Sequence, residues 1–289
     1  MRFSFAESMC DPGQYLPLAV AAERSGWHSF IVPDSLCYPE VSDSRYPYTP
    51  DGSREFLEGK PFIEPFSLIP AMGAVTERLR FTTFVVKLPI RQPVLVAKQA
   101  TSVAAITGDR FGFGVGLSPW PEDFQVTGTD WKSRGRRMDE MIEIVRGLST
   151  GEFFEYHGRH YDVPSIKLCP APSRPIPILI GGHAERALRR AARLGDGWMH
   201  AGGDAKQLAA MLGRIGELRR EYGRDRDPFE VHVISLDAYS VDGVRRLEDV
   251  GVTDVIVGFR NTYEPDTQTL EQKIDALRRY ADDVIAKAG

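Results

Sequence analysis

Gly181 and Gly182 stand between an apolar run and a helical pattern, where backbone amides can bind an anion. The apolar run that ends at Ile180 predicts a buried strand, and the alanine and leucine spacing after Ala184 predicts one face of a helix. Bare amides and the helix dipole at such a junction attract phosphate. A tight turn that binds nothing is the alternative, and the local pattern alone gives the two equal weight.

Two basic side chains near this junction are candidates for contact with the same anion. His183 starts the predicted helix, and Arg186 lies close enough to its start to reach a phosphate. The other arginines of the helix fall mostly away from its apolar face, so we expect them to be solvated.

Asp34 is the carboxylate whose position favours chemistry. It follows Pro33 at the end of a predicted strand and precedes a long polar stretch. A carboxylate there can accept a hydrogen bond from a cofactor or relay a proton. Capping of the next turn is the alternative interpretation, and we favour the functional one.

Other patterns carry weaker signals. Gly112, Gly114 and Gly116 imitate a phosphate loop but lie within a predicted strand, which indicates close packing or the approach of a ligand. Trp120 with Phe124 either walls a pocket or covers the molecule's top. The pair of histidines in the stretch 157–160 has no further ligands, so no metal site is expected.

The elements that position these residues alternate regularly between strand and helix. Strands are expected at 2–6, 27–32, 79–86, 111–117, 176–180, after 195, at 229–236 and at 253–258. Helices are expected at 11–25, 61–76, 94–107, from 134, from 184, at 208–222, 240–250 and 270–284, with a hairpin at 153–163. Eight such units predict a closed (β/α)₈ barrel in one domain, 1–289, and its active site belongs at the carboxyl ends of the strands. An open doubly wound sheet is the alternative, but no dinucleotide fingerprint follows the first strand.

Two insertions interrupt this alternation, at about 36–60 and 118–133. The first is rich in Tyr, Pro, Asp and Ser and lacks periodicity, which is typical of a lid or binding loop. Tyr38, Tyr46 and Tyr48 can supply its contacts to a ligand.

Composition narrows the class of partner. The 289 residues carry a net charge of −4, so neither nucleic acid nor a membrane surface is an expected partner. Three widely spaced cysteines, without a secretory signal or a membrane-spanning run, favour a cytoplasmic protein that acts on a small molecule.

Three ordered strings resemble the luciferase-like monooxygenase superfamily: TGDRFGFGVGLSPWPEDF at 107–124, LRFTTFVVKLPIRQPVLVAKQATSV at 79–103, and the stretch 176–198. Nearly the whole chain is similar, and it looks most like the actinobacterial branch that uses the deazaflavin coenzyme F420. This resemblance implies a (β/α)₈ TIM barrel with insertions at its carboxyl face. The deazaflavin ring would lie at that mouth.

The resemblance also implies roles for individual residues. A non-proline cis peptide at Phe84–Val85 would form a bulge behind the ring, and Asp34 would contact the ring. Gly181, Gly182 and the following helix start would hold the phosphate. The full expected cofactor set is Asp34, Thr83, Phe84, Val85, Ser118, Gly181, Gly182, His183 and Arg186. The expected catalytic residues are Asp34 and Ser35, and the expected substrate pocket contains Tyr38, Trp120 and Phe124.

Two departures bear on the substrate. Many deazaflavin-dependent alcohol and sugar-phosphate dehydrogenases of this family have a histidine where Ser35 stands, and the sugar-phosphate enzymes have a glutamate in the region of Pro119. Neither replacement is a good base, so we expect reduction of an electron-poor C=C or C=N group rather than oxidation of an alcohol.

Two other functions remain open. One is an FMN-dependent monooxygenase that uses oxygen and a partner reductase; the other is a barrel that binds a flavin-like ligand without turnover. Relatives are often homodimers, and composition does not decide the oligomeric state.

Overall fold

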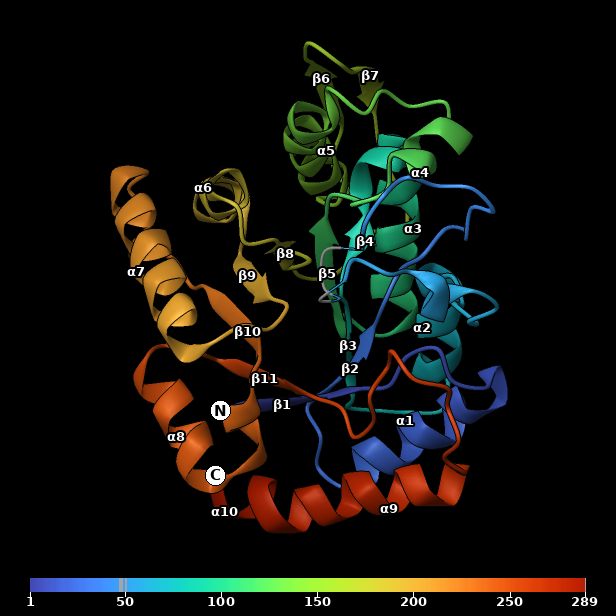
Figure 1. The fold of residues 1–289 in the computed structure, drawn as a ribbon. Helices are drawn as coiled ribbons and strands as arrows, with labels where there is room; N and C mark the ends of the chain where they lie inside the picture. Colours follow the sequence, from blue (N-terminus) through green and yellow to red (C-terminus); the bar gives the residue numbers. More distant parts are fainter. Residues whose placement is uncertain (47–48, 50, 289) are drawn as a thin grey trace.

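Eight parallel strands form a closed barrel in the computed structural model, which describes residues 1–46, 49 and 51–288 (Figure 1). They are β1 (Arg2–Ala6), β2 (Ser29–Val32), β3 (Arg80–Thr83), β5 (Phe111–Gly116), β8 (Ile178–Gly181), β9 (Gly197–His200), β10 (Glu230–Ile234) and β11 (Asp254–Val257). Pairing of β3 with β5 and of β1 with β11 closes the ring. The predicted (β/α)₈ barrel is confirmed.

Helices surround the strands because each strand sends alternate side chains outward to an apolar helix face. They are α1 (Tyr15–Arg24), α2 (Pro65–Gly73), α3 (Pro93–Ile106), α5 (Arg134–Leu148), α6 (Glu185–Leu194), α7 (Ala205–Glu221), α8 (Val241–Asp249) and α9 (Leu270–Tyr280). Figure 1 shows α9 beside α1, so the last helix covers the same side of the barrel as the first.

Smaller elements complete the chain. They are the short strand β4 (Val86–Lys87), the hairpin β6 (Phe154–His157) and β7 (Asp162–Ile166), helices α4 (Pro121–Val126) and α10 (Ala286–Ala288), and the turns η1 (Pro12–Gln14), η2 (Glu55–Leu57), η3 (Leu88–Ile90), η4 (Leu236–Tyr239) and η5 (Ala281–Ile285).

Most element boundaries shift by one to four residues from the sequence-based expectation, and three differences lie near the barrel mouth. The strand expected at 79–86 is split into β3 and β4 by a cis peptide at Phe84–Val85, which confirms the bond that the resemblance implied. The helix expected at 61–76 begins only at Pro65, because the Glu64 carboxylate accepts the Ser67 amide and caps it there. The second insertion contains the short helix α4 (Pro121–Val126), for which no helix was expected.

The barrel interior changes character from one end to the other. Its middle is filled by the apolar side chains of Ile31, Leu179, Met199 and Ile256. Near the mouth, Ala6, Phe84, Val85 and Ile234 are only partly buried and pack on this cluster. The mouth therefore has an apolar floor, which suits a flat ring system better than a charged group.

Candidate active site at the barrel mouth

The Phe84–Val85 bulge fits only because the neighbouring strands carry glycine. A Cβ at Gly116 would lie 2.6 Å from Val85 Cγ2, and one at Gly181 would lie 2.9 Å from Val85 Cγ1. Below them, a Cβ at Gly114 would meet the Thr83 carbonyl at 1.8 Å. The glycine repeat of β5 is thus explained by close packing, one of its two predicted meanings. Val85 is held against the floor of the mouth.

Asp34 is the centre of an ion pair rather than a free base. Its carboxylate accepts both Arg91 Nη2 at 3.0 Å and the Lys87 amide at 2.9 Å, and its side chain is 3% exposed. Arg91 also contacts Glu64 at 3.3 Å. Asp34 lies beside the bulge, its contact with a ring stays a prediction, and its charge is paired with Arg91, which the sequence analysis did not single out.

A second buried network lies on the other side of the bulge. Lys87 Nζ donates to Asp123 Oδ2 at 2.7 Å, and the Ser118 hydroxyl donates to the same oxygen. The Cys37 thiol lies 3.9 Å from Asp123 Oδ1. Burial, with the charge of Asp123 second, raises the pKa of Cys37, so this thiol stays protonated at neutral pH.

Thr83 and Ser118, two residues expected to contact the cofactor, have side chains that are buried and hydrogen-bonded within the protein. The Thr83 hydroxyl is fully buried and donates to the Gly114 carbonyl at 2.7 Å, and Ser118 is 2% exposed. Both side chains therefore support the bulge and the adjacent loop from within. Sequence reasoning missed Asp123 because nothing local distinguishes it from other acids of the insertion.

The glycine turn after β8 is built around two stacked histidines. The rings of His183 and His200 lie 4.5 Å apart at 22°. His183 Nε2 accepts the Ala201 amide at 3.1 Å, and His200 Nδ1 accepts the Gly202 amide at 3.3 Å. Neutral rings with these bonds carry their protons on His183 Nδ1 and His200 Nε2. Burial lowers both pKa values, that of His200 to about 4.

The turn differs from prediction in two details. Helix α6 begins at Glu185 with Ala184 as its N-cap, so His183 precedes the helix rather than starting it. Arg190 is 8% exposed and pairs with Asp139, whereas it had been placed on a solvated face. Arg186 is exposed near the start of α6, as expected. Gly182 has φ +123°, which favours glycine whatever it binds.

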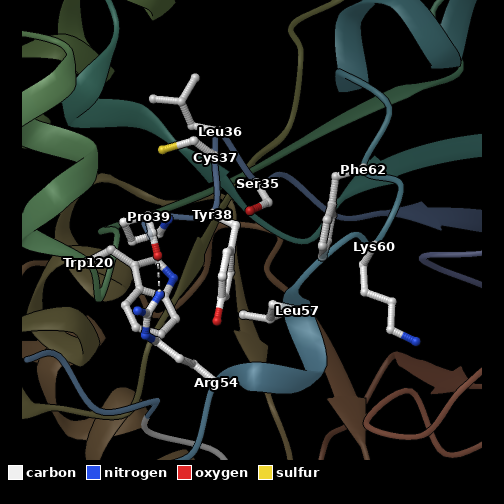
Figure 2. A pocket seen from close by; sticks show the side chains of 10 residues that line it. All are labelled: Ser35, Leu36, Cys37, Tyr38, Pro39, Arg54, Leu57, Lys60, Phe62 and Trp120. Carbon is white, nitrogen blue, oxygen red and sulfur yellow. Dashed lines mark hydrogen bonds between the residues drawn. The ribbon is translucent and has the colours of Figure 1, made fainter. Parts of the chain in front are cut away.

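Residues of the first insertion, with Ser35 and Trp120, line a partly open cavity of about 130 Å³ (Figure 2). Its lining residues are Ser35, Leu36, Cys37, Tyr38, Pro39, Arg54, Leu57, Lys60, Phe62 and Trp120. Tyr38 and Trp120 both line this cavity, while their contact with a substrate stays a prediction. Phe124 is 1% exposed, packs on Trp131 with ring centroids 5.0 Å apart, and does not line this cavity.

Aromatic contacts hold the insertion over the mouth. Tyr46 stacks on Trp120 at 5.8 Å and meets the edge of Tyr263 at 6.1 Å, and Phe56 contacts Tyr263 at 4.8 Å. The insertion therefore covers the mouth, while its mobility stays a prediction. Tyr48, the third tyrosine named from the sequence, lies outside the described residues.

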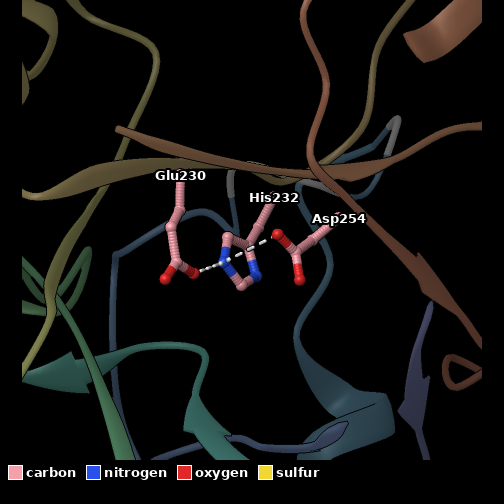
Figure 3. Close-up of side chains that lie close together, drawn as sticks. All are labelled: Glu230, His232 and Asp254. Atoms are coloured by element: carbon pink, nitrogen blue, oxygen red, sulfur yellow. Dashed lines mark hydrogen bonds and ion pairs between the residues drawn. The ribbon is translucent and has the colours of Figure 1, made fainter. Parts of the chain in front are cut away.

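A charged cluster lies at the opposite end of the barrel (Figure 3). His232 Nε2 is 2.8 Å from Glu230 and 3.4 Å from Asp254. Arg2 donates to Asp254 at 3.0 Å and also pairs with Glu230 at 3.1 Å. Although three metal-compatible side chains meet here, Arg2 already supplies the positive charge. We describe the cluster as a buried ion-pair network, far from the carboxyl ends of the strands.

Comparison with known proteins assigns the chain to a family. The model of the family described as luciferase-like monooxygenase matches residues 6–258. The chain belongs to the luciferase-like monooxygenase family. An uncharacterized protein of Mycobacterium tuberculosis (strain H37Rv) is 61% identical, over 99% of this chain and 100% of its own length.

More distant relatives have named activities. An F420-dependent glucose-6-phosphate dehydrogenase of Tsukamurella paurometabola is 28% identical over 82% of this chain and 68% of its own length. A monooxygenase from Streptomyces bottropensis has a solved structure of the same fold, with TM-score 0.78, 16% identity and full coverage of both chains. Members of the family are oxidoreductases and monooxygenases. No helix in the described part of the chain is long and apolar enough to cross a membrane.

Proposed function

We propose that this luciferase-like protein binds the deazaflavin coenzyme F420 and reduces a small organic substrate with it. The apolar floor around Val85 supports the ring assignment, because Ala6, Phe84, Val85 and Ile234 are only partly buried and offer an apolar surface to a flat group. The relative with F420-dependent activity supports the choice of deazaflavin. When bound in its reduced form, the cofactor supplies a hydride.

The residues around the β8 turn fit the cofactor's phosphate. His200 Nε2 is a buried donor without a hydrogen-bond partner among the described residues, and His183 Nδ1 is the second free donor of the stack. The amides of Gly181, Gly182 and His183 precede the start of α6, with Arg186 one turn further. This donor set can bind the oxygen atoms of an anion, and burial, which lowers the pKa of both histidines, favours rings that each donate through one N–H.

The ion pair between Asp34 and Arg91 is the observation that supports reduction, rather than alcohol oxidation, as the direction of the reaction. Alcohol oxidation needs a base that takes the hydroxyl proton, and the charge of Asp34 is already paired with Arg91. Ser35 lines the cavity but its hydroxyl is a poor base. Reduction needs only a proton donor, and Ser35 or the protonated Cys37 thiol at the cavity wall can serve.

A cofactor titration followed by a substrate panel tests this function. We expect F420 to bind at least tenfold more tightly than FMN, and Arg186→Gln to weaken F420 binding several-fold. Arg189→Gln, one turn along α6 and paired with Glu185, serves as the matched control and should bind F420 normally.

Reduced F420 should then be oxidised by enones or imines, while oxidised F420 should stay unchanged with alcohols or glucose 6-phosphate. Tighter FMN binding with substrate-dependent oxygen consumption would replace the proposal by an FMN monooxygenase. Absence of binding to either cofactor would point to a barrel without this chemistry.

A further inference from the structure

Arg54 is an almost fully buried cation in the wall of the cavity under the first insertion. The residue is 8% exposed, and its guanidinium lies 4.7 Å from the centre of the Tyr38 ring. Nη1 donates to the Pro39 carbonyl at 2.8 Å, a bond drawn in Figure 2. The other guanidinium N–H groups make no hydrogen bond with the residues that the structure describes.

This cation also makes no ion pair within the described part of the chain. Glu55 and Glu122 both sense its charge without forming an ion pair with it. Glu55 accepts the backbone amide of Arg54 at 2.9 Å, and Glu122 accepts hydrogen bonds from the hydroxyls of Ser42 and Ser44. A buried charge without a partner is costly, whereas the same charge opposite a carboxylate is compensated. Arg54 is therefore arranged to receive an anion from outside the chain.

Lys60, the second cation of the lining, has a different orientation. Its Nζ donates to the Glu264 carbonyl at 3.2 Å, and Figure 2 shows the amine turned away from the other labelled side chains. No carboxylate lines the cavity. The anion position is thus defined by Arg54 alone, whose planar fork matches a carboxylate.

The remaining lining residues are mostly apolar, which indicates the kind of ligand body that the cavity can hold. Tyr38, Phe62 and Trp120 provide aromatic walls, and Leu57 adds an aliphatic one. A cavity of about 150 Å³ in another protein holds one benzene molecule, so the volume of about 130 Å³ here suits a single flat ring or a short unsaturated chain. Ser35 in the same wall directly follows Asp34, which places the cavity beside the bulge.

We propose that this cavity is the substrate subsite and that it selects a small, flat carboxylate, anchored by Arg54. That the bound carboxylate is a substrate depends on the proposed function. That a carboxylate binds here depends only on the cavity and its lining. It narrows the electron-poor acceptor to an unsaturated or aromatic acid.

Calorimetric titration of the cofactor-free protein tests the proposal, with benzoate as probe and benzamide as its neutral counterpart. We expect benzoate to bind with a Kd of about 1 mM or tighter and benzamide at least tenfold more weakly. Arg54→Gln should abolish this preference, and Arg54→Lys should retain part of it, because charge remains without the fork. Arg45→Gln is the matched control, since Arg45 belongs to the same insertion, is exposed and does not line the cavity.

Equal binding of benzoate and benzamide to the unmodified protein, or no binding of benzoate at 10 mM, overturns the proposal without any variant. A benzoate preference that survives in folded Arg54→Gln also overturns it. Failure of F420 to bind, with the benzoate preference intact, rejects the proposed function and leaves the carboxylate site standing.

Discussion

The chemical role open to each carboxylate at this barrel mouth depends on its ion-pair partner more than on its position along the chain. Asp34 and Asp123 both lie beside the bulge, and each is paired with a cation, Arg91 and Lys87. Lys87 links the two, because its amide donates to Asp34 while its amine donates to Asp123. This arrangement anchors the bulge on both sides, and it leaves neither Asp34 nor Asp123 as an uncompensated carboxylate that could act as a strong base.

Asp34→Asn tests the structural part of this interpretation. The change removes the charge that compensates partly buried Arg91, so we expect the free energy of unfolding to fall by about 2–4 kcal/mol in urea titrations. Glu64→Gln is the control, because Glu64 contacts the same arginine with a side chain that is 41% exposed, and glutamine keeps an oxygen that can accept the Ser67 amide at the start of α2. Its effect should stay within about 1 kcal/mol. Equal small effects from both changes would show that the Asp34–Arg91 pair does not stabilise the fold.

At the scale of elements, β3, the bulge after it and the neighbouring strands β5 and β8 pack closely against one another. The bulge displaces Val85 toward β5 and β8, and glycines on both strands make the space for it. The floor of the mouth therefore depends on the absence of side chains at several positions, as much as on the residues present.

Gly114→Ala should break this unit. Its Cβ would lie 1.8 Å from the Thr83 carbonyl and 2.7 Å from Met199 Sδ, and the backbone cannot move without opening the β3–β5 junction. We expect a loss of at least about 3 kcal/mol, or no soluble protein.

Gly213→Ala provides the comparison for Gly114→Ala. Gly213 lies within α7 with no atom within 4 Å of a built Cβ, so alanine there should raise stability by about 0.5–1 kcal/mol. Thermal and urea unfolding measure both variants. A stable Gly114→Ala protein would show that β5 tolerates side chains, and the packing explanation of its glycines would be wrong.

At the scale of the whole molecule, the two ends of the barrel have different tasks. The carboxyl end carries the apolar floor, the glycine turn and the covered cavity, while the amino end carries the network of Arg2, Glu230, His232 and Asp254. This division agrees with the general pattern of such barrels, in which chemistry belongs to the carboxyl end and stability to the other.

Buried histidines at both ends predict how stability depends on pH. Burial lowers the pKa of His28 and of His200 from 6.5 to about 4, so the folded state favours their neutral forms. The two neutral histidines contribute fully to the free energy of unfolding above pH 6.5. This contribution is lost as the pH falls from 6.5 toward 4, and it changes no further below pH 4. Each histidine adds at most about 1.4 kcal/mol per pH unit to the slope of stability in this window.

His200→Gln and His28→Gln should each flatten that slope in urea titrations between pH 6.5 and 4. His157→Gln should leave it nearly unchanged, because His157 is exposed and its pKa is raised by the hydrogen bond with Asp162. Slopes that are identical in all four proteins would show that neither buried ring is forced to remain neutral.

Local patterns were sufficient for the fold and for the position of the mouth. Apolar periodicity places the strands and helices within a few residues, because a buried face must be apolar wherever the chain later packs. The turn at Gly181 and Gly182 between a strand and a helix was also expected from the sequence. The cis peptide at Phe84–Val85 was expected through the resemblance. Both features belong to short contiguous motifs.

The chemistry of the site depends on partners that are distant in sequence. Arg91 lies 57 residues from Asp34, and Asp123 lies 36 residues from Lys87. Arg54 becomes a candidate only in the folded insertion, where its guanidinium lies against the Tyr38 ring and the residue is 8% exposed. Charge pairing and burial are properties of three-dimensional neighbours, and no spacing along the chain encodes them. For that reason the sequence indicated Asp34 as a cofactor contact or proton relay without its arginine partner, and it did not indicate Arg54 as a binding residue at all.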